Sequence, residues 1–166
     1  MDKSIKALFL AASLVTTSAF ADNFILSSKL RFDYFSPHFI THNGSYLLIK
    51  YKDWSFSHEN IEPDKFYSTV DISGYERDFL RAGYDTKYRS KLPKKLTAVS
   101  KEFTKGLNNK PDTIKHYKIG DAEILTGHDG KNSGQIYIME ELAIHQIVVN
   151  GEKKYLDLIL KNIKER

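Results

Sequence analysis

The sequence predicts an α+β fold with a largely antiparallel sheet and helices packed on it, either as a general layered arrangement or, more specifically, as an α/β/α sandwich. Two observations lead to this prediction. The predicted elements follow the order strands, helices, strands and a closing helix, and short turns join the strands of the C-terminal half as in hairpins. No repeat, low-complexity tract or linker interrupts the chain. Residues 22–166 are therefore expected to form one domain, for which they are about the commonest size.

The first predicted elements are strands. Leu30–Phe35 alternates apolar and polar residues, as expected for a half-buried strand. Asn43 and Gly44 then indicate a turn. Tyr46–Ser57 is predicted as one strong strand, whose apolar residues change parity midway and so indicate a bulge or a strand with both faces covered. Phe66–Ile72 follows as a weaker strand.

Two helices are predicted in the middle of the chain. Ser73 and Glu76 form a capping-box pattern at the start of a short helix, Gly74–Ala82, which Gly83 would end. In the second helix, apolar residues recur at spacings of four, three, four and four and form one stripe. Pro93 fits its first turn, where a missing N–H costs nothing. The residues of the stripe are Leu92, Leu96, Val99, Phe103 and Leu107.

In the C-terminal half the hydrophobic period returns to two, which predicts four strands. Residues 129–134 are the strongest turn signal of the chain. The last strand carries apolar residues on both faces, which is typical of a central strand covered on both sides. A closing helix, Glu152–Lys164, follows it. The four strands are Thr113–Ile119, Ala122–Gly127, Gln135–Glu140 and Ala143–Asn150.

Residues 1–21 have the layout of a secretory signal peptide. Lys3 and Lys6 precede an unbroken apolar run, Ala7–Val15, and residues 19–21 supply an A-x-A cleavage site. The run is too short to cross a bilayer, which takes roughly 20 apolar residues. We therefore expect cleavage after Ala21, a mature chain that begins at Asp22 without a transmembrane segment, and a periplasmic or secreted location.

The order of these elements resembles the PsbP-like α/β/α sandwich. The resemblance covers most of residues 22–166 and rests on a signal peptide, a strand that carries a Trp, a mid-chain amphipathic helix, a long hairpin and a closing helix. The matching segments are Tyr46–Phe56, Leu92–Leu107 and Tyr155–Ile163. Members of that group are mostly small non-catalytic accessory or binding proteins, and some bacterial envelope members act as stabilising or immunity partners. The resemblance implies a function of this kind, but it transfers no site residues.

Composition narrows the range of functions. The chain has no cysteine, which excludes disulfides, thiol catalysis and cysteine metal sites. Its formal charge of +4 is mild, whereas nucleic-acid binders show a concentrated basic stripe, so we expect no nucleic-acid partner. One basic stretch, Lys87–Lys105, is either the solvated face of a helix or a contact surface for an acidic partner or anionic envelope material.

The histidines and the strongest turn give no predicted metal site or cofactor. His38 and His42 are four residues apart, but their neighbours indicate a loop rather than a helix, so we expect surface histidines. Asp129–Glu140 has several residue types of a calcium loop, yet Lys131 occupies a ligand position and the flanks are predicted strands. A plain hairpin loop explains this segment.

One catalytic arrangement stays open as an alternative. His128, Asp129 and His145 could meet across the hairpin, with Ser133 as the nucleophile of a small envelope hydrolase. Ser133 lies in Asn-Ser-Gly, however, and not in the shaped G-x-S-x-G turn of many hydrolases.

Carboxylate pairs suggest no general acid and base. Glu140 and Glu141 are adjacent on a predicted strand and therefore point to opposite faces. Glu59 and Glu62 lie near Pro63 in a predicted loop, where we expect them to be solvated.

The aromatic residues give the leading functional prediction. Tyr and Arg are enriched at protein interfaces, and several gather between the two predicted helices. They either bind a partner or cover the edge of a small core. These residues are Tyr75, Arg77, Arg81, Tyr84, Tyr88 and Arg89.

The leading hypothesis is therefore a non-catalytic, secreted or periplasmic protein-binding domain, of the inhibitor or immunity type or an envelope accessory protein. Its partner would be another protein, which it would bind by surface occlusion. Besides the hydrolase, a second alternative is a small-ligand carrier with a pocket between sheet and helix, lined by Trp54 and Phe56.

Overall fold

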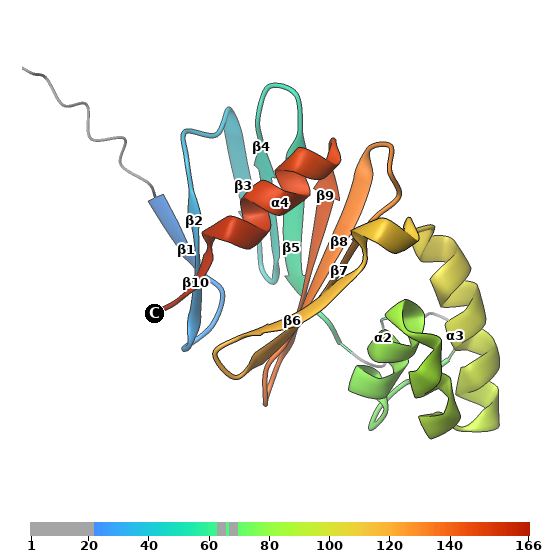
Figure 1. Cartoon of the computed structure of the whole chain (residues 1–166). Helices are drawn as coiled ribbons and strands as arrows, with labels where there is room; N and C mark the ends of the chain where they lie inside the picture. Colours follow the sequence, from blue (N-terminus) through green and yellow to red (C-terminus); the bar gives the residue numbers. More distant parts are fainter. Residues whose placement is uncertain (1–21, 63–65, 67–69) are drawn as a thin grey trace, which may run out of the picture.

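The chain folds into two antiparallel sheets with helices packed against them (Figure 1). The computed structural model describes residues 22–62, 66 and 70–166. The predicted signal peptide, residues 1–21, lies outside the described residues. The predicted α+β class with a largely antiparallel sheet is confirmed.

The larger sheet has seven strands in the order β3-β4-β5-β9-β8-β7-β6, and each neighbouring pair is antiparallel. The smaller sheet has the order β1-β2-β10. The strands of the larger sheet are β3 (Phe39–Asn43), β4 (Tyr46–Lys50), β5 (Ser55–Asn60), β6 (Lys115–Ile119), β7 (Ala122–His128), β8 (Ser133–Met139) and β9 (Ile144–Asn150). The smaller sheet consists of β1 (Asp22–Ile25), β2 (Leu30–Tyr34) and β10 (Ile163–Glu165).

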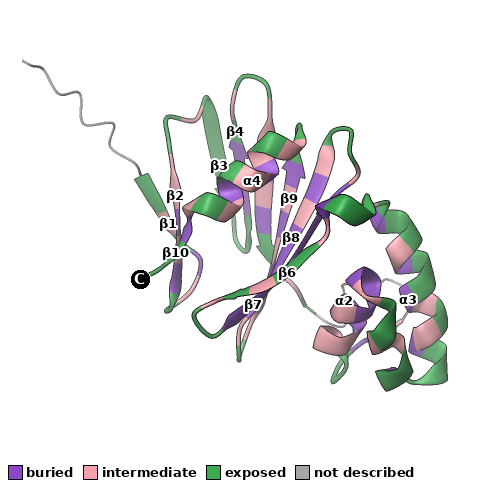
Figure 2. Cartoon of the chain, viewed as in Figure 1, coloured by how far each residue is buried: buried purple, intermediate pink, exposed green. Residues whose placement is uncertain are grey.

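Each face of the larger sheet is covered by helix, because the central strands are apolar on both sides (Figure 2). On β8, Ile136 and Ile138 pack towards α4 (Lys153–Asn162) and β2, whereas Tyr137 and Met139 pack towards α2 (Glu76–Tyr84) and α3 (Lys94–Leu107). Two hydrophobic cores result, one on each face.

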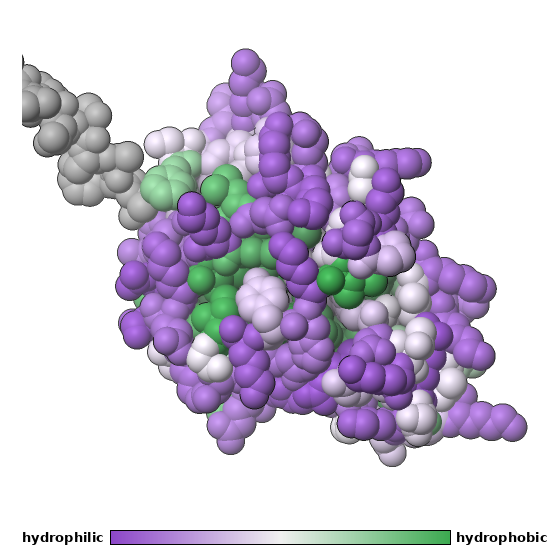
Figure 3. Space-filling view, viewed as in Figure 1, coloured by the Kyte–Doolittle hydropathy of each residue, from purple (hydrophilic) through white to green (hydrophobic). Residues whose placement is uncertain are grey.

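The first core lies between the larger sheet, α4 and the smaller sheet. Leu156 and Ile159 anchor α4 in it, and Phe32 reaches it from β2. Hydrophilic side chains cover most of this side of the molecule, and apolar atoms show between α4 and β6 (Figure 3). There the half-buried Tyr117 and Ile119 pack against the core.

The second core is built by α2 and α3 on the opposite face. The apolar stripe predicted for the second helix is buried here through Leu96, Phe103 and Leu107. Helix α3 follows Pro93 and ends at Leu107, and the residue that caps it, Asn108, has a left-handed φ of 49°. A 3-10 turn, η1 (Thr86–Lys91), links α2 to α3, and a second one, η2 (Pro111–Thr113), leads into β6.

The long strand predicted over Tyr46–Ser57 is wrong, because the segment is a hairpin of β4 and β5. The Tyr51 N–H donates to the Trp54 carbonyl at 2.9 Å and closes the turn, and Ile49 pairs with Phe56 across it. The change of parity therefore marks a reversal of the chain and not a bulge. A turn without Gly or Pro gave no signal for it.

The predicted capping box and the helix end at Gly83 are also wrong. Ser73 Oγ donates to Asp71 instead of capping a helix, and α2 begins at Glu76. Gly83 lies inside α2, where an added Cβ would come within 2.5 Å of the Phe103 ring. Its lack of a side chain lets α2 and α3 approach closely.

Three short strands were not predicted, namely β1, β3 and β10. Helix α4 ends at Asn162, and the residues that follow form β10 beside β2. Of the predicted strand Phe66–Ile72, Phe66 is helical and residues 70–72 lie outside any strand. Its residues 67–69 lie outside the described residues.

Candidate functional site

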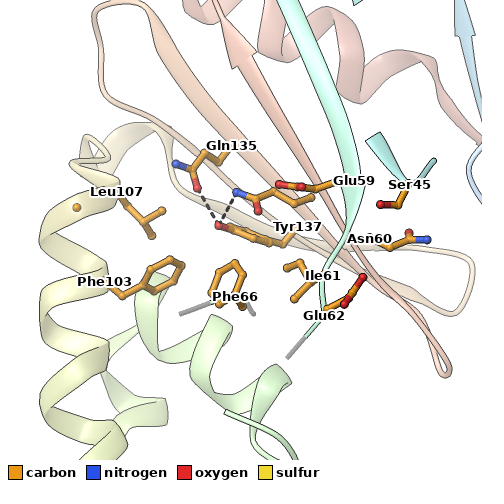
Figure 4. A pocket seen from close by; sticks show the side chains of 12 residues that line it. Ser45, Glu59, Asn60, Ile61, Glu62, Phe66, Phe103, Leu107, Gln135 and Tyr137 are labelled. Atoms are coloured by element: carbon orange, nitrogen blue, oxygen red, sulfur yellow. Dashed lines mark hydrogen bonds between the residues drawn. The ribbon is translucent and has the colours of Figure 1, made fainter. Parts of the chain in front are cut away.

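A cavity of about 420 Å³ lies between α3 and the face of the larger sheet formed by β5, β9 and β8 (Figure 4). Phe103, Gly106 and Leu107 line it from the helix, and Phe66 lines it from the segment before α2. The cavity opens to solvent, because Glu59, Glu62 and Gly106 of its lining are exposed. A hollow of this size, which lies in the usual range for ligand sites, therefore makes this the candidate site.

A row of three polar side chains forms the floor of the cavity. Glu59 of β5 pairs with Gln146 of β9, which in turn pairs with Tyr137 of β8. Cross-strand partners point to the same face of a sheet, so the strand register brings the three together. Gln135 lies two residues before Tyr137 and shares its face.

The floor residues form a short hydrogen-bond chain. Gln146 Nε2–H donates to Tyr137 Oη at 3.1 Å, and Tyr137 O–H donates to Gln135 Oε1 at 2.9 Å (Figure 4). Among the described residues, the Gln135 amide nitrogen and the Gln146 amide oxygen make no further hydrogen bond. The floor therefore offers one donor and one acceptor to a bound molecule.

Tyr137 is held as a neutral phenol. Its side chain is only 1% exposed, and burial raises its pKa well above the ordinary value, with a further contribution from the charges of Tyr84 and Glu59. It therefore orients the two glutamines without carrying a charge itself.

Three aromatic rings form the apolar wall. The ring centroids of Phe66 and Phe103 lie 5.7 Å apart, and those of Phe66 and Tyr137 lie 6.2 Å apart. Both pairs meet edge to face, at 71° and 81°, which is a favourable geometry for aromatic pairs. Leu107 extends this wall along α3.

Among the described residues, two charged groups line the cavity, and both are acidic. They are Glu59 and Glu62, and the lining residues of the described chain include no Lys, Arg or His. The sequence predicted both glutamates to be solvated loop residues. Both are exposed, but Glu59 lies on β5 rather than in a loop, and the register of β5 with β9 aligns it with the cavity floor.

The predicted partner surface is divided by the fold. Tyr84 is a core residue with 8% exposure, which contradicts its assignment to that surface. Arg81 forms a two-pronged contact to Glu123, with Nε donating to Oε1 at 2.8 Å, and so joins α2 to β7. Arg89 donates to Thr104 Oγ1 of α3 at 2.9 Å. These three residues have structural contacts that the sequence pattern did not reveal.

The other three residues of that surface remain accessible. Tyr75 is 42% exposed, and the half-buried Arg77 donates to the Glu141 carbonyl at 3.1 Å. Tyr88 is half-buried and has the ammonium groups of Lys87 and Lys91 over its ring, at 5.2 and 5.0 Å from the centroid. These residues therefore form a basic surface around the ring of Tyr88.

The structure separates His145 from the other hydrolase residues, whereas His128 Nδ1 lies 3.6 Å from Asp129 Oδ1. His128 pairs with Gly134 of β8, whereas His145 pairs with Ile138, four residues further along the same strand. Four residues of strand span about 13 Å. The backbone N–H of Gly130 donates to His128 Nδ1, so His128 Nε2–H donates to the Gly151 carbonyl at 2.9 Å. It is thereby fixed as a structural residue of the hairpin.

Asp129 is also engaged in hydrogen bonds within the turn. Its Oδ1 accepts from the backbone N–H groups of Lys131 and Ser133, at 2.7 and 3.1 Å. Asp129 precedes β8 and Glu140 follows it, so the two carboxylates of the calcium-loop pattern stand at opposite ends of a strand. His42 lies on β3, whose residues are all exposed. Among the described residues, no three His, Asp or Glu side chains are grouped to hold a metal ion.

The pocket predicted beside Trp54 and Phe56 is wrong, because that region is packed. Phe56 is 1% exposed in the first core. Trp54 is stacked between Tyr51 and Tyr155, with centroids 4.2 and 4.8 Å away. A cavity between sheet and helix does exist, but it lies on the opposite face and uses α3.

A buried pair of histidines lies on the side of the larger sheet that holds the first core, and no sequence pattern predicted it. Ser27 Oγ–H donates to Glu140 at 2.8 Å, and the other oxygen of Glu140 lies 3.1 Å from His145 Nε2. His145 Nδ1 lies 3.2 Å from His58 Nε2, and the two residues are 87 positions apart. Because only the fold joins these four side chains, no local pattern could have revealed them.

Comparison with known protein families, with curated proteins and with solved structures finds no match to this chain. The resemblance to the PsbP-like group therefore stays a prediction from the order of elements. In the part of the chain that the structure describes, no helix has the length and apolar character needed to span a bilayer.

Proposed function

We propose that this protein binds a small organic molecule, without catalysis, in the cavity between α3 and the β5–β9–β8 face. One observation carries the proposal: the cavity of about 420 Å³ joins an apolar aromatic wall to a polar floor. Ligand sites have this composition, in which apolar surface supplies binding energy and a few placed polar groups fix orientation.

The polar floor supports binding more than it supports reaction. With respect to the described residues, the Gln135 amide nitrogen and the Gln146 amide oxygen are left to orient a ligand, and Tyr137 is neutral. No nucleophile with an adjacent base lines the cavity in the described chain. A carrier or sensor of a small molecule fits these groups.

A substitution that fills the cavity tests this proposal. Gly106 lines the cavity, and an added Cβ there meets no atom within 4 Å, so Gly106→Leu should occupy the cavity without disturbing the helix. We expect ligand-observed NMR with a library of small amphiphilic compounds to find binders of the wild type, and we expect their affinity for Gly106→Leu to fall at least about tenfold.

Ala98→Leu is the matched control, because Ala98 lies on the exposed side of the same helix. It should bind the same compounds as the wild type. The proposal fails if no compound binds, or if the compounds bind equally well to Gly106→Leu.

A protein partner is the second candidate function, favoured by the basic surface around Tyr88. We propose an acidic protein of the bacterial envelope as the partner, in keeping with the predicted signal peptide and with an immunity-type or accessory role. An accessible aromatic ring flanked by cations suits contact with carboxylates and apolar surface together.

The accessible residues of this surface provide the test. We expect Tyr75→Ala combined with Tyr88→Ala to lose most of the partner that the wild type captures from envelope extract, measured by quantitative mass spectrometry. Tyr46→Ala, at an exposed aromatic residue on the distant strand β4, is the control. Equal capture by all three proteins would exclude this surface.

A further inference from the structure

We infer that the ligand of the cavity is an organic cation, an amine or quaternary ammonium group carried on an apolar body. The inference rests on the proposed function and adds the ligand's charge and shape. It is carried by the juxtaposition of Glu59 with the aromatic wall of Phe66, Phe103 and Tyr137.

The charge of the cavity lining favours a cation. The chain has more basic than acidic residues, 25 Lys and Arg against 21 Asp and Glu, yet the described lining of the cavity holds Glu59 and Glu62 and no basic side chain. Glu59 forms no ion pair with any described residue. An anionic ligand would be repelled here, whereas a cation would gain a carboxylate partner.

The polar and the apolar groups occupy different parts of the cavity. Glu59 and Gln146 occupy the β5–β9 part of the floor, while Phe103 and Leu107 stand on the α3 side (Figure 4). An elongated ligand can therefore place a charged head beside Glu59 and the Gln146 amide oxygen, with its apolar body against the rings. Both groups near the head accept hydrogen bonds, which an ammonium donates.

The aromatic rings add a second attraction for the same ligand. The face of a phenol or phenyl ring attracts a cation within about 6 Å of its centroid. Phe66, which is half-buried, lines the cavity together with Glu59. Among the described residues, the lining combines an aromatic ring and a carboxylate with no basic group, so it should distinguish an ammonium from a neutral molecule of the same shape.

Three probes of nearly equal shape separate charge from shape: phenylbutylamine, phenylbutanol and phenylbutyrate. At neutral pH they are a cation, a neutral molecule and an anion. We expect calorimetric titration to show the amine binding about 3- to 10-fold more tightly than the alcohol, and the carboxylate binding more weakly than both. Raising the salt to about 0.5 M should reduce the difference between amine and alcohol.

A pair of carboxylate variants assigns the preference to the cavity. Glu59→Gln should lower the affinity for the amine more than the affinity for the alcohol, so the amine-to-alcohol ratio of affinities should fall below that of the wild type. Glu102→Gln removes an exposed carboxylate of α3 that does not line the cavity, and it should keep the wild-type ratio. Gly106→Leu should lose all three probes.

The outcomes separate this inference from the proposed function. If the alcohol binds as tightly as the amine and Gly106→Leu abolishes both, the cavity is a ligand site but the preference for cations is wrong. If none of the probes binds up to millimolar concentration, the inference fails for these ligands, and the broader compound library then decides the proposed function. If the amine is preferred equally by wild type and Glu59→Gln, the assignment to Glu59 is overturned.

Discussion

His58 is the residue whose surroundings most constrain its chemistry. It is 5% exposed, and Nε2 faces His145 while Nδ1 is buried without a hydrogen-bond partner in the described structure. The ring of Phe24 meets it edge to face at 5.2 Å. A second proton would reach Nδ1 in this apolar position, so burial lowers its pKa to about 4, with smaller effects from His145 and His42.

Stability should therefore depend on pH through His58. The unfolded chain takes up a proton near pKa 6.5, whereas the folded chain takes it up only near 4, so the unfolded state binds more protons between these values. The free energy of unfolding should be highest above about pH 6.5 and fall on acidification, by roughly 2 kcal/mol at about pH 5 and roughly 3 kcal/mol at about pH 4. Urea unfolding followed by circular dichroism measures this loss.

His58→Gln is the matched variant, because it keeps a donor towards His145 and cannot be protonated. As the pH falls, the wild type should lose more unfolding free energy than His58→Gln. Any stability advantage of the wild type over the variant should therefore shrink or reverse. A difference that stays constant from neutral pH to about pH 5 would contradict the assignment to His58.

Residue type alone could not separate contact residues from structural ones. The Tyr and Arg cluster between the predicted helices indicates a contact surface, but Tyr84 is buried and Arg81 pairs with Glu123. Residue type also did not reveal the place of Glu59 in the cavity, because the pairing of β5 with β9 puts it there.

At the scale of elements, α2 and α3 carry two glycines with opposite roles. Gly83 of α2 faces the Phe103 ring, with an added Cβ at 2.5 Å, whereas Gly106 of α3 has open space around it. Sequence alone treats both as helix-weakening residues. Only the packing shows that one is required for close approach and the other is free to change.

The two helices should therefore respond in opposite ways to the same substitution. Gly106→Ala should raise the free energy of unfolding by about 1 kcal/mol, because Ala has the better helix propensity. Gly83→Ala should lower it by about 1 to 3 kcal/mol, because the new methyl group displaces Phe103. Thermal and urea unfolding of the two variants provide the measurement, and stabilisation by Gly83→Ala would contradict the described packing.

Elements with a strong periodic pattern were predicted well, and short or exposed ones were not. The stripe of α3 and the strands β7, β8 and β9 have buried apolar residues at regular spacing, so local sequence suffices. By contrast, β3 is exposed along its whole length and β10 has three residues. Such strands exist because a neighbouring strand offers hydrogen bonds, which a local pattern does not contain.

At the scale of the whole molecule, the fold class followed from the order of elements, but the candidate site did not. A pocket between sheet and helix was one of the alternatives, and the face was wrong because the Tyr46–Ser57 segment turns back on itself. The floor of the actual cavity needs β5 beside β9 and β9 beside β8. No single segment of the sequence predicts this long-range pairing.

The same pairing of β5 with β9 has a consequence for the order in which the chain folds. The meander β3-β4-β5 gains its neighbour in the sheet only after α2, α3 and the strands up to β9 have been synthesised. Joining segments so distant in sequence requires a large loop to close first, which makes folding slow. The newly made chain should therefore pass through a period in which one edge of β5 is unpaired, and we expect that edge to be open to aggregation until β9 pairs with it.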